Sequence, residues 1–335
     1  MNWNSQQPLS VQVDITSYCN ARCGGCARNI YGGEVQPWLE LNHLDKELWY
    51  RFCTQDTIDR NISHLKFNGN WGDAGMHPHL PEMISVFGKC NPEASIQVCT
   101  NGGTHNTEWW AMLGNAFARN TKYHAVDFAL DGLEETHSIY RRSTDYNKIL
   151  NNAEAFISAG GNARWIMTLF DYNIHQVDEA IEVARNNKFA SIKFRYSHSK
   201  NSKVKTDTEE YILSTDKADK IPLPQQVNFE GTKMFNDLFE INESKCPWYR
   251  EKRIQISPWG NVWPCCHIAD TLEGIDDYSK QQEISTDMDM NPDWNDLNKN
   301  TLTEILANTW FTDILDKAVE HGKYGVCIDN CGVTT

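Results

Sequence analysis

The sequence predicts an α/β protein in which a parallel sheet of six strands precedes a small cysteine-rich unit. Between residues 11 and 197, six apolar segments of strand length alternate with amphipathic segments of helix length, which is typical of β-α units in a parallel sheet. The 335-residue chain has eleven cysteines, of which three lie close together near its start and five lie beyond residue 245. Such clusters in a long chain indicate metal ligands rather than disulfides.

Each expected strand is a short apolar run. The strands are Val11–Thr16, Ser63–Asn68, Ser95–Thr100, Ala125–Leu130, Ala163–Leu169 and Ser191–Tyr196. The segments between them carry apolar residues at helical spacing. They are Asp45–Arg51, Pro81–Phe87, Thr107–Phe117, Tyr146–Ala159 and Val177–Asn186. Because parallel α/β sheets place their sites at the carboxyl ends of strands, we expect the polar residues found there to share one site.

The chain divides into three parts: residues 1–200 with the β-α units, a polar connector over 201–244, and a cysteine-rich unit over 245–335. In the last part, Ile254–Ile256 and Val262 are expected to form a hairpin that turns at Gly260, since glycine tolerates a positive φ. The apolar spacing over Thr301–His321 predicts one helix. The acidic segment Asp276–Asp296 is expected to be a solvated loop.

Composition excludes several classes of protein. A formal net charge of -14 argues against a nucleic-acid partner, because nucleic-acid binders carry basic patches. No apolar run approaches the roughly 18 residues that span a bilayer. Met1–Ser10 has neither the basic nor the apolar region of a signal peptide,. We therefore expect a cytoplasmic protein that binds neither nucleic acid nor membrane.

Cys19, Cys23 and Cys26 form a C-x3-C-x2-C run directly after the first expected strand. Three thiolates can bind one iron–sulfur cluster, but they leave one iron of a four-iron cluster without a protein ligand. Electron carriers supply four cysteines per cluster. The incomplete ligand set therefore indicates chemistry at the open iron.

This run and the polar segments that follow the later strands resemble the radical S-adenosylmethionine (SAM) superfamily. The matching segments are Cys19–Cys26, Trp71-Gly72-Asp73-Ala74 in place of a G-G-E-P segment, Thr100-Asn101-Gly102, Asp131-Gly132 with His137 and Tyr140-Arg141, and Asn173. Gly25 stands where the family usually has an aromatic residue, and Asp73 and Ala74 replace its glutamate and proline. Each short segment is also an ordinary turn sequence, and their order along the chain favours a shared site.

The resemblance implies a partial (β/α)6 parallel barrel with a 4Fe–4S cluster on Cys19, Cys23 and Cys26, and SAM bound to the fourth iron. Glycine lets the backbone approach SAM, the Asp73 carboxylate can accept hydrogen bonds from its ammonium group, and Arg141 can bind its carboxylate. The SAM-binding residues that the resemblance implies are Gly72, Asp73, Thr100, Asn101, Asp131, Arg141 and Asn173.

Cys246 and Cys265 bracket Gly260 in a C-x13-G-x4-C arrangement that resembles the opening of SPASM and Twitch auxiliary-cluster domains. Five cysteines are too few for the two clusters of a SPASM domain, so the Twitch form fits better. By this resemblance, the ligands of one auxiliary 4Fe–4S cluster are Cys246, Cys265, Cys327 and Cys331. Neighbouring residues of an extended segment point to opposite sides, and the spacing favours Cys265 over Cys266. A zinc site with four cysteines is the alternative.

The remaining candidates have no motif around them. Cys53, Cys90 and Cys99 are isolated and are expected to be small buried apolar residues. By position alone, four residues are candidates for substrate contact, with a structural role equally open: His77, His79, Arg195 and Tyr196.

The resemblance implies a radical SAM enzyme of oxidoreductase type. An external one-electron reductant, such as flavodoxin or ferredoxin, would drive cleavage of SAM to a 5′-deoxyadenosyl radical that abstracts a hydrogen atom from the substrate. An auxiliary cluster with four cysteines has no open iron, which favours acceptance of an electron from the substrate and a net oxidation. The substrate is a small molecule, or a peptide or protein side chain that is modified or cross-linked. The alternatives are a non-enzymatic iron–sulfur or zinc protein, and a relative that binds SAM without catalysis.

Overall fold

A computed structural model describes residues 9–57, 60–121, 123–197, 200–222, 226–229, 246, 252–274, 278–288 and 293–331. Six parallel strands form the centre of the molecule. They are β1 (Leu9–Val13), β2 (Ile62–Phe67), β3 (Ser95–Thr100), β4 (Tyr123–Ala129), β5 (Ala163–Leu169) and β6 (Ser191–Tyr196). They pair in chain order within one nine-stranded sheet, so the predicted α/β fold, a partial (β/α)6 barrel, is confirmed.

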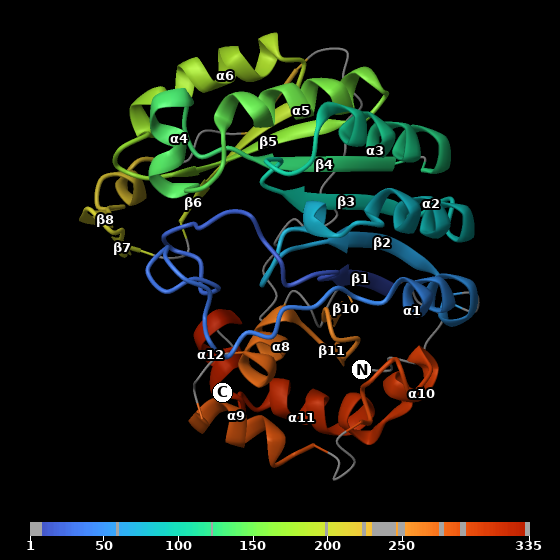
Figure 1. The fold of residues 1–335 in the computed structure, drawn as a ribbon. Coiled ribbons are helices and arrows are strands. Elements are labelled where there is room, and N and C mark those ends of the chain that lie inside the picture. The colour runs from blue at the N-terminus through green and yellow to red at the C-terminus, as the bar shows by residue number, and fades with distance from the viewer. Residues whose placement is uncertain are drawn as a thin grey trace.

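The helices between these strands lie outside the sheet (Figure 1). They are α1 (Lys46–Arg51), α2 (Leu80–Cys90), α3 (Thr107–Asn120), α4 (Glu134–Tyr140), α5 (Tyr146–Ser158) and α6 (Val177–Asn186). Side chains on the helix-covered face of the strands, such as Val98, Phe128 and Met167, are fully buried. Burial of large apolar side chains stabilises the fold, and truncating one Phe to Ala costs about 3–5 kcal/mol.

The inner face of the sheet is polar. Gln97, Asp127 and Arg164, from three successive strands, are all buried. The Gln97 amide donates to Asp127 Oδ2 over 2.7 Å and Arg164 Nε donates to Asp127 Oδ1 over 2.6 Å. Because buried charges are stable only when paired, this network builds a polar barrel interior that leads to the carboxyl ends of the strands.

The C-terminal unit continues the same sheet. β10 (Arg253–Ile256) pairs in parallel with β1, with Ile254 opposite Val11, and antiparallel with β11 (Val262–Trp263). Gly260 has a φ of 94° in the intervening turn. The predicted hairpin therefore forms, and it attaches the cysteine-rich unit to the β1 edge of the barrel.

Short helices complete this unit next to the hairpin (Figure 1). They are α8 (Cys266–Glu273), α9 (Tyr278–Ser285), α10 (Leu302–Ala307), the π-helical η5 (Trp310–Ile314), α11 (Leu315–Glu320) and α12 (Gly325–Cys331). The prediction of one helix over Thr301–His321 is wrong, because Asn308 is extended with a ψ of 143° and its side chain accepts a hydrogen bond from Trp310 N. The predicted loop at Asp276–Asp296 is also wrong where it is described, since it contains α9 with Ile284 fully buried.

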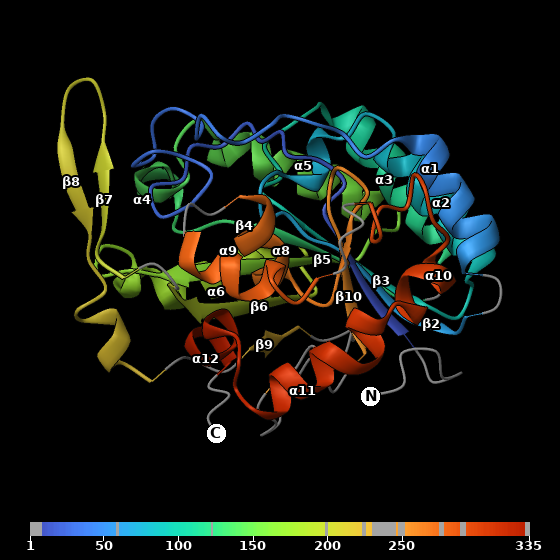
Figure 2. The same ribbon diagram turned by 90° about the horizontal axis from the view of Figure 1, so that it is seen from below.

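The connector carries only short elements in its described part. β7 (Ser202–Lys205) and β8 (Glu210–Leu213) form a hairpin that projects from one end of the molecule (Figure 2). Val204 packs on the cysteine loop so closely that a Cβ on Gly24 would lie 2.2 Å from it. β9 (Val227–Asn228) pairs antiparallel with β6, and residues 223–225 and 230–244 of the predicted connector lie outside the described part.

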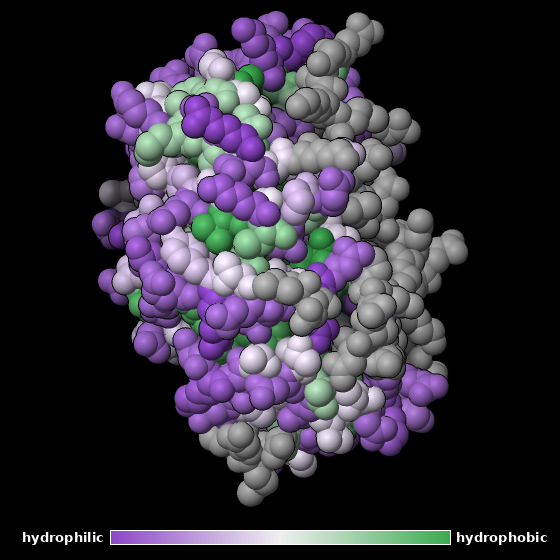
Figure 3. Space-filling view, turned by 90° about the vertical axis from the view of Figure 1, so that its right-hand side faces the viewer, coloured by the Kyte–Doolittle hydropathy of each residue, from purple (hydrophilic) through white to green (hydrophobic). Residues whose placement is uncertain are grey.

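Figure 3 shows one outer face of the molecule, on which hydrophilic residues dominate and apolar residues occur in small separate patches. Among the described residues, none of the helices combines the length and the apolar character needed to cross a membrane.

Candidate active site and second cysteine pocket

A cavity of about 380 Å³ lies at the carboxyl ends of the parallel strands. Its lining includes eight residues that the sequence placed at a cluster or SAM site, namely Cys19, Cys23, Cys26, Gly72, Asp73, Thr100, Asn101 and Arg141. Segments more than a hundred residues apart in the chain therefore meet in one cavity. Two of the expected SAM-binding residues, Asp131 and Asn173, are fully buried and do not line it.

The carboxylate of Asp73 joins the ends of β2 and β3. Its Oδ1 accepts hydrogen bonds from Gly75 N (2.9 Å) and Thr100 Oγ1 (2.7 Å). Its Oδ2 accepts two from Asn101, from the backbone N at 2.6 Å and from Nδ2 at 2.7 Å. Burial raises the pKa of Asp73, although the bonds from Asn101 and Thr100 favour the ionised form. A carboxylate has about four acceptor positions, so the protein fills them, and Asp73 holds Thr100 and Asn101 in place.

Gly72 is required by a close approach of two backbone segments. A Cβ at this position would lie 2.1 Å from Thr16 O, which no side chain can occupy. The next residue, Asp73, donates its backbone N–H to Tyr18 O over 2.9 Å. The loop after β2 is therefore fixed against the segment that leads into the three cysteines.

The three thiols of the first run are surrounded by donors. Cys19 Sγ accepts hydrogen bonds from Ala21 N (3.4 Å) and Asn101 Nδ2 (3.8 Å). Arg141 Nη1 donates to Cys23 Sγ over 3.7 Å. Burial raises the pKa of Cys19 to about 12 and that of Cys23 to about 11. Burial therefore favours the neutral thiols, whereas metal ligation favours the thiolate form, and N–H donors aimed at sulfur are features that tune iron–sulfur clusters.

Arg141 is held from behind by Asp131. Its Nε donates to Asp131 Oδ2 over 2.6 Å, while Asp131 Oδ1 accepts from Thr168 N over 2.5 Å. This leaves the other guanidinium nitrogens on the cavity side, next to Cys23. The Asn173 amide donates to the backbone oxygens of Asp131 (3.1 Å) and Thr168 (2.9 Å). Asp131 and Asn173 thus fix the loops after β4 and β5.

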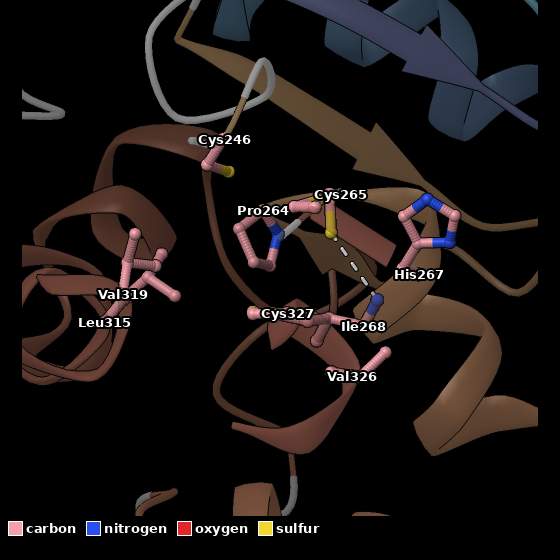
Figure 4. Close-up of a pocket in the computed structure, with 10 residues that line it drawn as sticks. Cys246, Pro264, Cys265, His267, Ile268, Leu315, Val319, Val326 and Cys327 are labelled. Atoms are coloured by element: carbon pink, nitrogen blue, oxygen red, sulfur yellow. Dashed lines mark hydrogen bonds between the residues drawn. The ribbon is translucent and has the colours of Figure 1, made fainter. Parts of the chain in front are cut away.

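The C-terminal cysteines line a second, separate pocket (Figure 4). Its four thiols belong to Cys246, Cys265, Cys327 and Cys331. Figure 4 shows the sulfur atoms of Cys246 and Cys265 directed into the pocket, where Cys265 Sγ also accepts a hydrogen bond from Ile268 N over 3.5 Å. Cys327 and Cys331 lie four residues apart on α12, which places them on one helix face. The rest of the lining is mostly apolar, with Pro264, Ile268, Leu315, Val319 and Val326.

Cys266 does not line this pocket. It begins α8, and burial raises the pKa of its thiol, with further contributions from the charges of Asp270 and Asp14. Cys265 caps the same helix and turns the other way. The two neighbouring cysteines therefore have different surroundings, and only Cys265 shares a pocket with Cys246.

The alternative to a cluster at the C-terminal cysteines is a single zinc ion. Within the described residues, no group of three or more His, Cys, Asp or Glu side chains is spaced to hold one metal ion. A structural zinc ion needs four ligands at about 2.0–2.3 Å.

Several sequence-based expectations about isolated residues are wrong. Cys53 is fully buried as expected, but Cys90 is exposed. Cys99 lines the main cavity, where its thiol faces Asp127 Oδ2 at 3.9 Å. The sequence could have indicated the position of Cys99. Alternate residues of a strand share a face, and the polar Gln97 marks the face of β3 that it shares with Cys99 as the barrel interior.

The four substrate-contact candidates divide in the structure. Arg195 and Tyr196 line the cavity, whereas His77 and His79 do not. His77 is buried, and its Nε2 donates to Leu44 O over 3.0 Å. Burial lowers its pKa to about 4, which keeps the ring neutral in a structural position.

The sequence matches no family model and no curated protein. The structure resembles Streptococcus suis SuiB bound to the precursor peptide SuiA, with a TM-score of 0.58 and 13% identity over 92% of this chain and 67% of that one. It also resembles anSMEcpe with bound AdoMet, with a TM-score of 0.57 and 13% identity over 91% and 79% of the two chains. Against SuiB bound to SAM, it covers 62% of that chain, with 15% identity and a TM-score of 0.53. At these identities the likeness concerns the fold alone.

Proposed function

We propose that the protein is a radical SAM enzyme. The observation that carries the proposal is the meeting of three thiols with Asp73, Asn101 and Arg141 in one cavity at the carboxyl ends of the barrel strands. The residues fit the cofactor: three thiols could serve as cluster ligands, and N–H groups donate to the sulfurs of Cys19 and Cys23. When bound, a 4Fe–4S cluster with SAM supplies an electron and a 5′-deoxyadenosyl radical that abstracts a hydrogen atom from the substrate.

The chain's own residues position SAM. Arg141, braced by Asp131, is proposed to donate from Nη2 to the SAM carboxylate, because its Nε is bonded to Asp131 and its Nη1 to Cys23 Sγ,. Gly72 has no side chain, so its backbone can form part of the cavity wall. Asp73 fixes the side chains of Thr100 and Asn101 at the edge of the proposed SAM site. The buried surroundings exclude water and hold the reacting groups in a fixed orientation.

The second pocket is proposed to hold an auxiliary 4Fe–4S cluster on its four cysteines, as in a Twitch domain. Four thiols leave no ligand position open, and the apolar lining suits a site that takes up an electron without binding substrate,. The reaction would then be a net oxidation, with a flavodoxin or ferredoxin as the external reductant. A zinc ion on the same four cysteines is the alternative for this pocket.

Two substrate classes are open, and the solved relatives favour one of them. SuiB was solved with its precursor peptide SuiA, and anSMEcpe with the Kp18Cys peptide at a TM-score of 0.56. These neighbours support modification or cross-linking of a peptide or protein side chain. A small-molecule substrate is the second class, and it uses the same cavity.

The test is anaerobic reconstitution with iron and sulfide, followed by assay of 5′-deoxyadenosine with dithionite and SAM. Two four-iron clusters give about eight irons per chain, and 5′-deoxyadenosine should form only when reductant and SAM are both present. Replacing Cys19, Cys23 and Cys26 together by alanine should abolish cleavage and halve the iron. Cys90→Ala, at an exposed cysteine outside both pockets, is the matched control. Cleavage by the triple variant would show that the first site is assigned wrongly.

A further inference from the structure

Three arginines line the main cavity: Arg28, Arg141 and Arg195. Two of them are engaged by the protein. Arg28 donates to Ser17 O over 3.1 Å and to Asn29 Oδ1 over 3.2 Å, and Arg141 is paired with Asp131. The side chain of Arg195 makes no hydrogen bond or ion pair with any residue that the structure describes. A partly buried guanidinium without an acceptor is unfavourable, so this side chain is set for a partner that enters the cavity.

Arg195 points into the barrel from its β6 wall. It is opposite Thr168 in the β5–β6 register, and Thr168 also lines the cavity. The Cys99 thiol of β3 lines the same cavity. The residues proposed for SAM come instead from the loops after β1, β2 and β3 and from the end of α4. Arg195 therefore lies on a different wall from the proposed SAM site.

The carboxylates that line the cavity do not compete for Arg195. Asp127 is paired with Arg164 at 2.6 Å and bonded to Gln97 at 2.7 Å. Asp73 is occupied by four donors. With both carboxylates already compensated, an incoming anion meets the uncompensated charge of Arg195.

We propose that Arg195 is the anion-recognition residue of the substrate subsite, and that the substrate carries a carboxylate or phosphate group that binds its guanidinium. Arginine is suited to this because its planar fork matches the two oxygens of either group. The inference rests on the proposed function and adds to it a substrate class: an anionic metabolite, or a peptide with an acidic group near the reacting carbon.

The test measures anion binding to the reconstituted, SAM-loaded protein by equilibrium dialysis at constant ionic strength. Labelled inorganic phosphate and labelled acetate are the probes, and the tighter of the two identifies the group. One saturable site is expected in the wild-type protein, with binding about tenfold weaker in Arg195→Gln. Arg195→Lys keeps the positive charge, so its affinity for the anion should lie between those of the wild type and Arg195→Gln. Arg185→Gln, at an exposed arginine of α6, should bind as the wild type does.

Three results would overturn the inference. They are the absence of saturable binding of either probe to the wild type, equal binding by Arg195→Gln, and a loss of SAM affinity in Arg195→Gln as large as that in Arg141→Gln. The last result would assign Arg195 to the SAM site. Iron content checks that each variant is folded and loaded. Failure of the proposed function is distinguishable, because it appears as absence of 5′-deoxyadenosine from the wild-type protein.

Discussion

Replacing Asp73 by asparagine tests whether this carboxylate organises the cavity wall. Asparagine carries an NH2 group in place of one carboxylate oxygen. In either orientation of the amide, this group faces two hydrogen-bond donors that the carboxylate oxygen accepts from in the wild type. A buried donor left without an acceptor costs about 1–3 kcal/mol. If the amide replaces Oδ2, Asn101 Nδ2 keeps a second acceptor in Asn20 Oδ1 at 2.9 Å. Two donors without an acceptor would together cost about 2–6 kcal/mol, and the retained bond to Asn20 places the expected loss of unfolding free energy toward the lower end, about 2–3 kcal/mol.

The functional effect of Asp73→Asn should exceed its effect on stability. Thr100 and Asn101 lose their anchor, and Asn101 is also a donor to Cys19. Loss of such supporting contacts typically costs about 10–100-fold in affinity or activity. We expect SAM dissociation constants, measured on iron-loaded protein, to rise by about this factor, while Tm falls by several degrees.

Asp171→Asn is the matched control for this prediction. The Asp171 carboxylate also accepts several hydrogen bonds, from Lys217 N, Ala218 N and Ser214 Oγ, but it lies outside the cavity lining. It should lower Tm without changing SAM affinity. Wild-type SAM affinity in fully loaded Asp73→Asn would refute the role given to Asp73.

Three further predictions concern the loops and the second pocket. Gly72→Ala places a Cβ 2.1 Å from Thr16 O and should displace the cysteine loop, so that iron bound at the first site falls while the auxiliary iron stays; full iron loading would contradict this. Cys327→Ala should reduce bound iron from about eight to about four per chain, whereas Cys266→Ala should leave it unchanged; the reverse pattern in iron analysis would exchange their roles. Burial lowers the pKa of His77 to about 4, below about 6.5 for an exposed histidine. The folded state therefore binds fewer protons between these values, and the free energy of unfolding should fall by up to about 3 kcal/mol as the pH drops from about 6.5 to 4. His77→Gln should reduce the slope of Tm against pH in this range. An unchanged slope would show that His77 does not contribute to the pH dependence of stability.

Local patterns predicted the barrel well because each strand is a buried apolar run between helices. The predicted strand Val11–Thr16 forms as Leu9–Val13, and Ser95–Thr100 and Ala163–Leu169 form as predicted. The pairing of β10 with β1 joins residues over two hundred positions apart. Such a contact is decided by tertiary packing, and no local pattern reveals it.

The helix breaks show where local chemistry overrode periodicity. Asn308 interrupts an apolar spacing that reads as continuous, because its side chain offers Trp310 N an acceptor in place of the helical one,. α9 was missed because its sequence is mostly polar, although one of its own residues, Ile284, is fully buried. In both cases one side chain's surroundings decided the outcome.

The candidate site was predicted in position but not in detail. Motif order placed Cys19, Asp73 and Arg141 together, and they share one cavity. The sequence could not show that Asp131 and Asn173 stand behind that cavity, because burial depends on the neighbouring loops. Cys99, which faces the cavity, was predicted to be buried like the exposed Cys90, although its alternation with the polar Gln97 along β3 separates the two.

The central claim is that SAM binds at the cluster of Cys19, Cys23 and Cys26. The most direct test records the electron paramagnetic resonance spectrum of the dithionite-reduced Cys327→Ala protein with and without SAM. This variant keeps only the first proposed cluster, so its signal has a single source. We predict that SAM shifts the spectrum and that 5′-deoxyadenosine then forms. An identical spectrum at saturating SAM, with four irons bound, would contradict the claim.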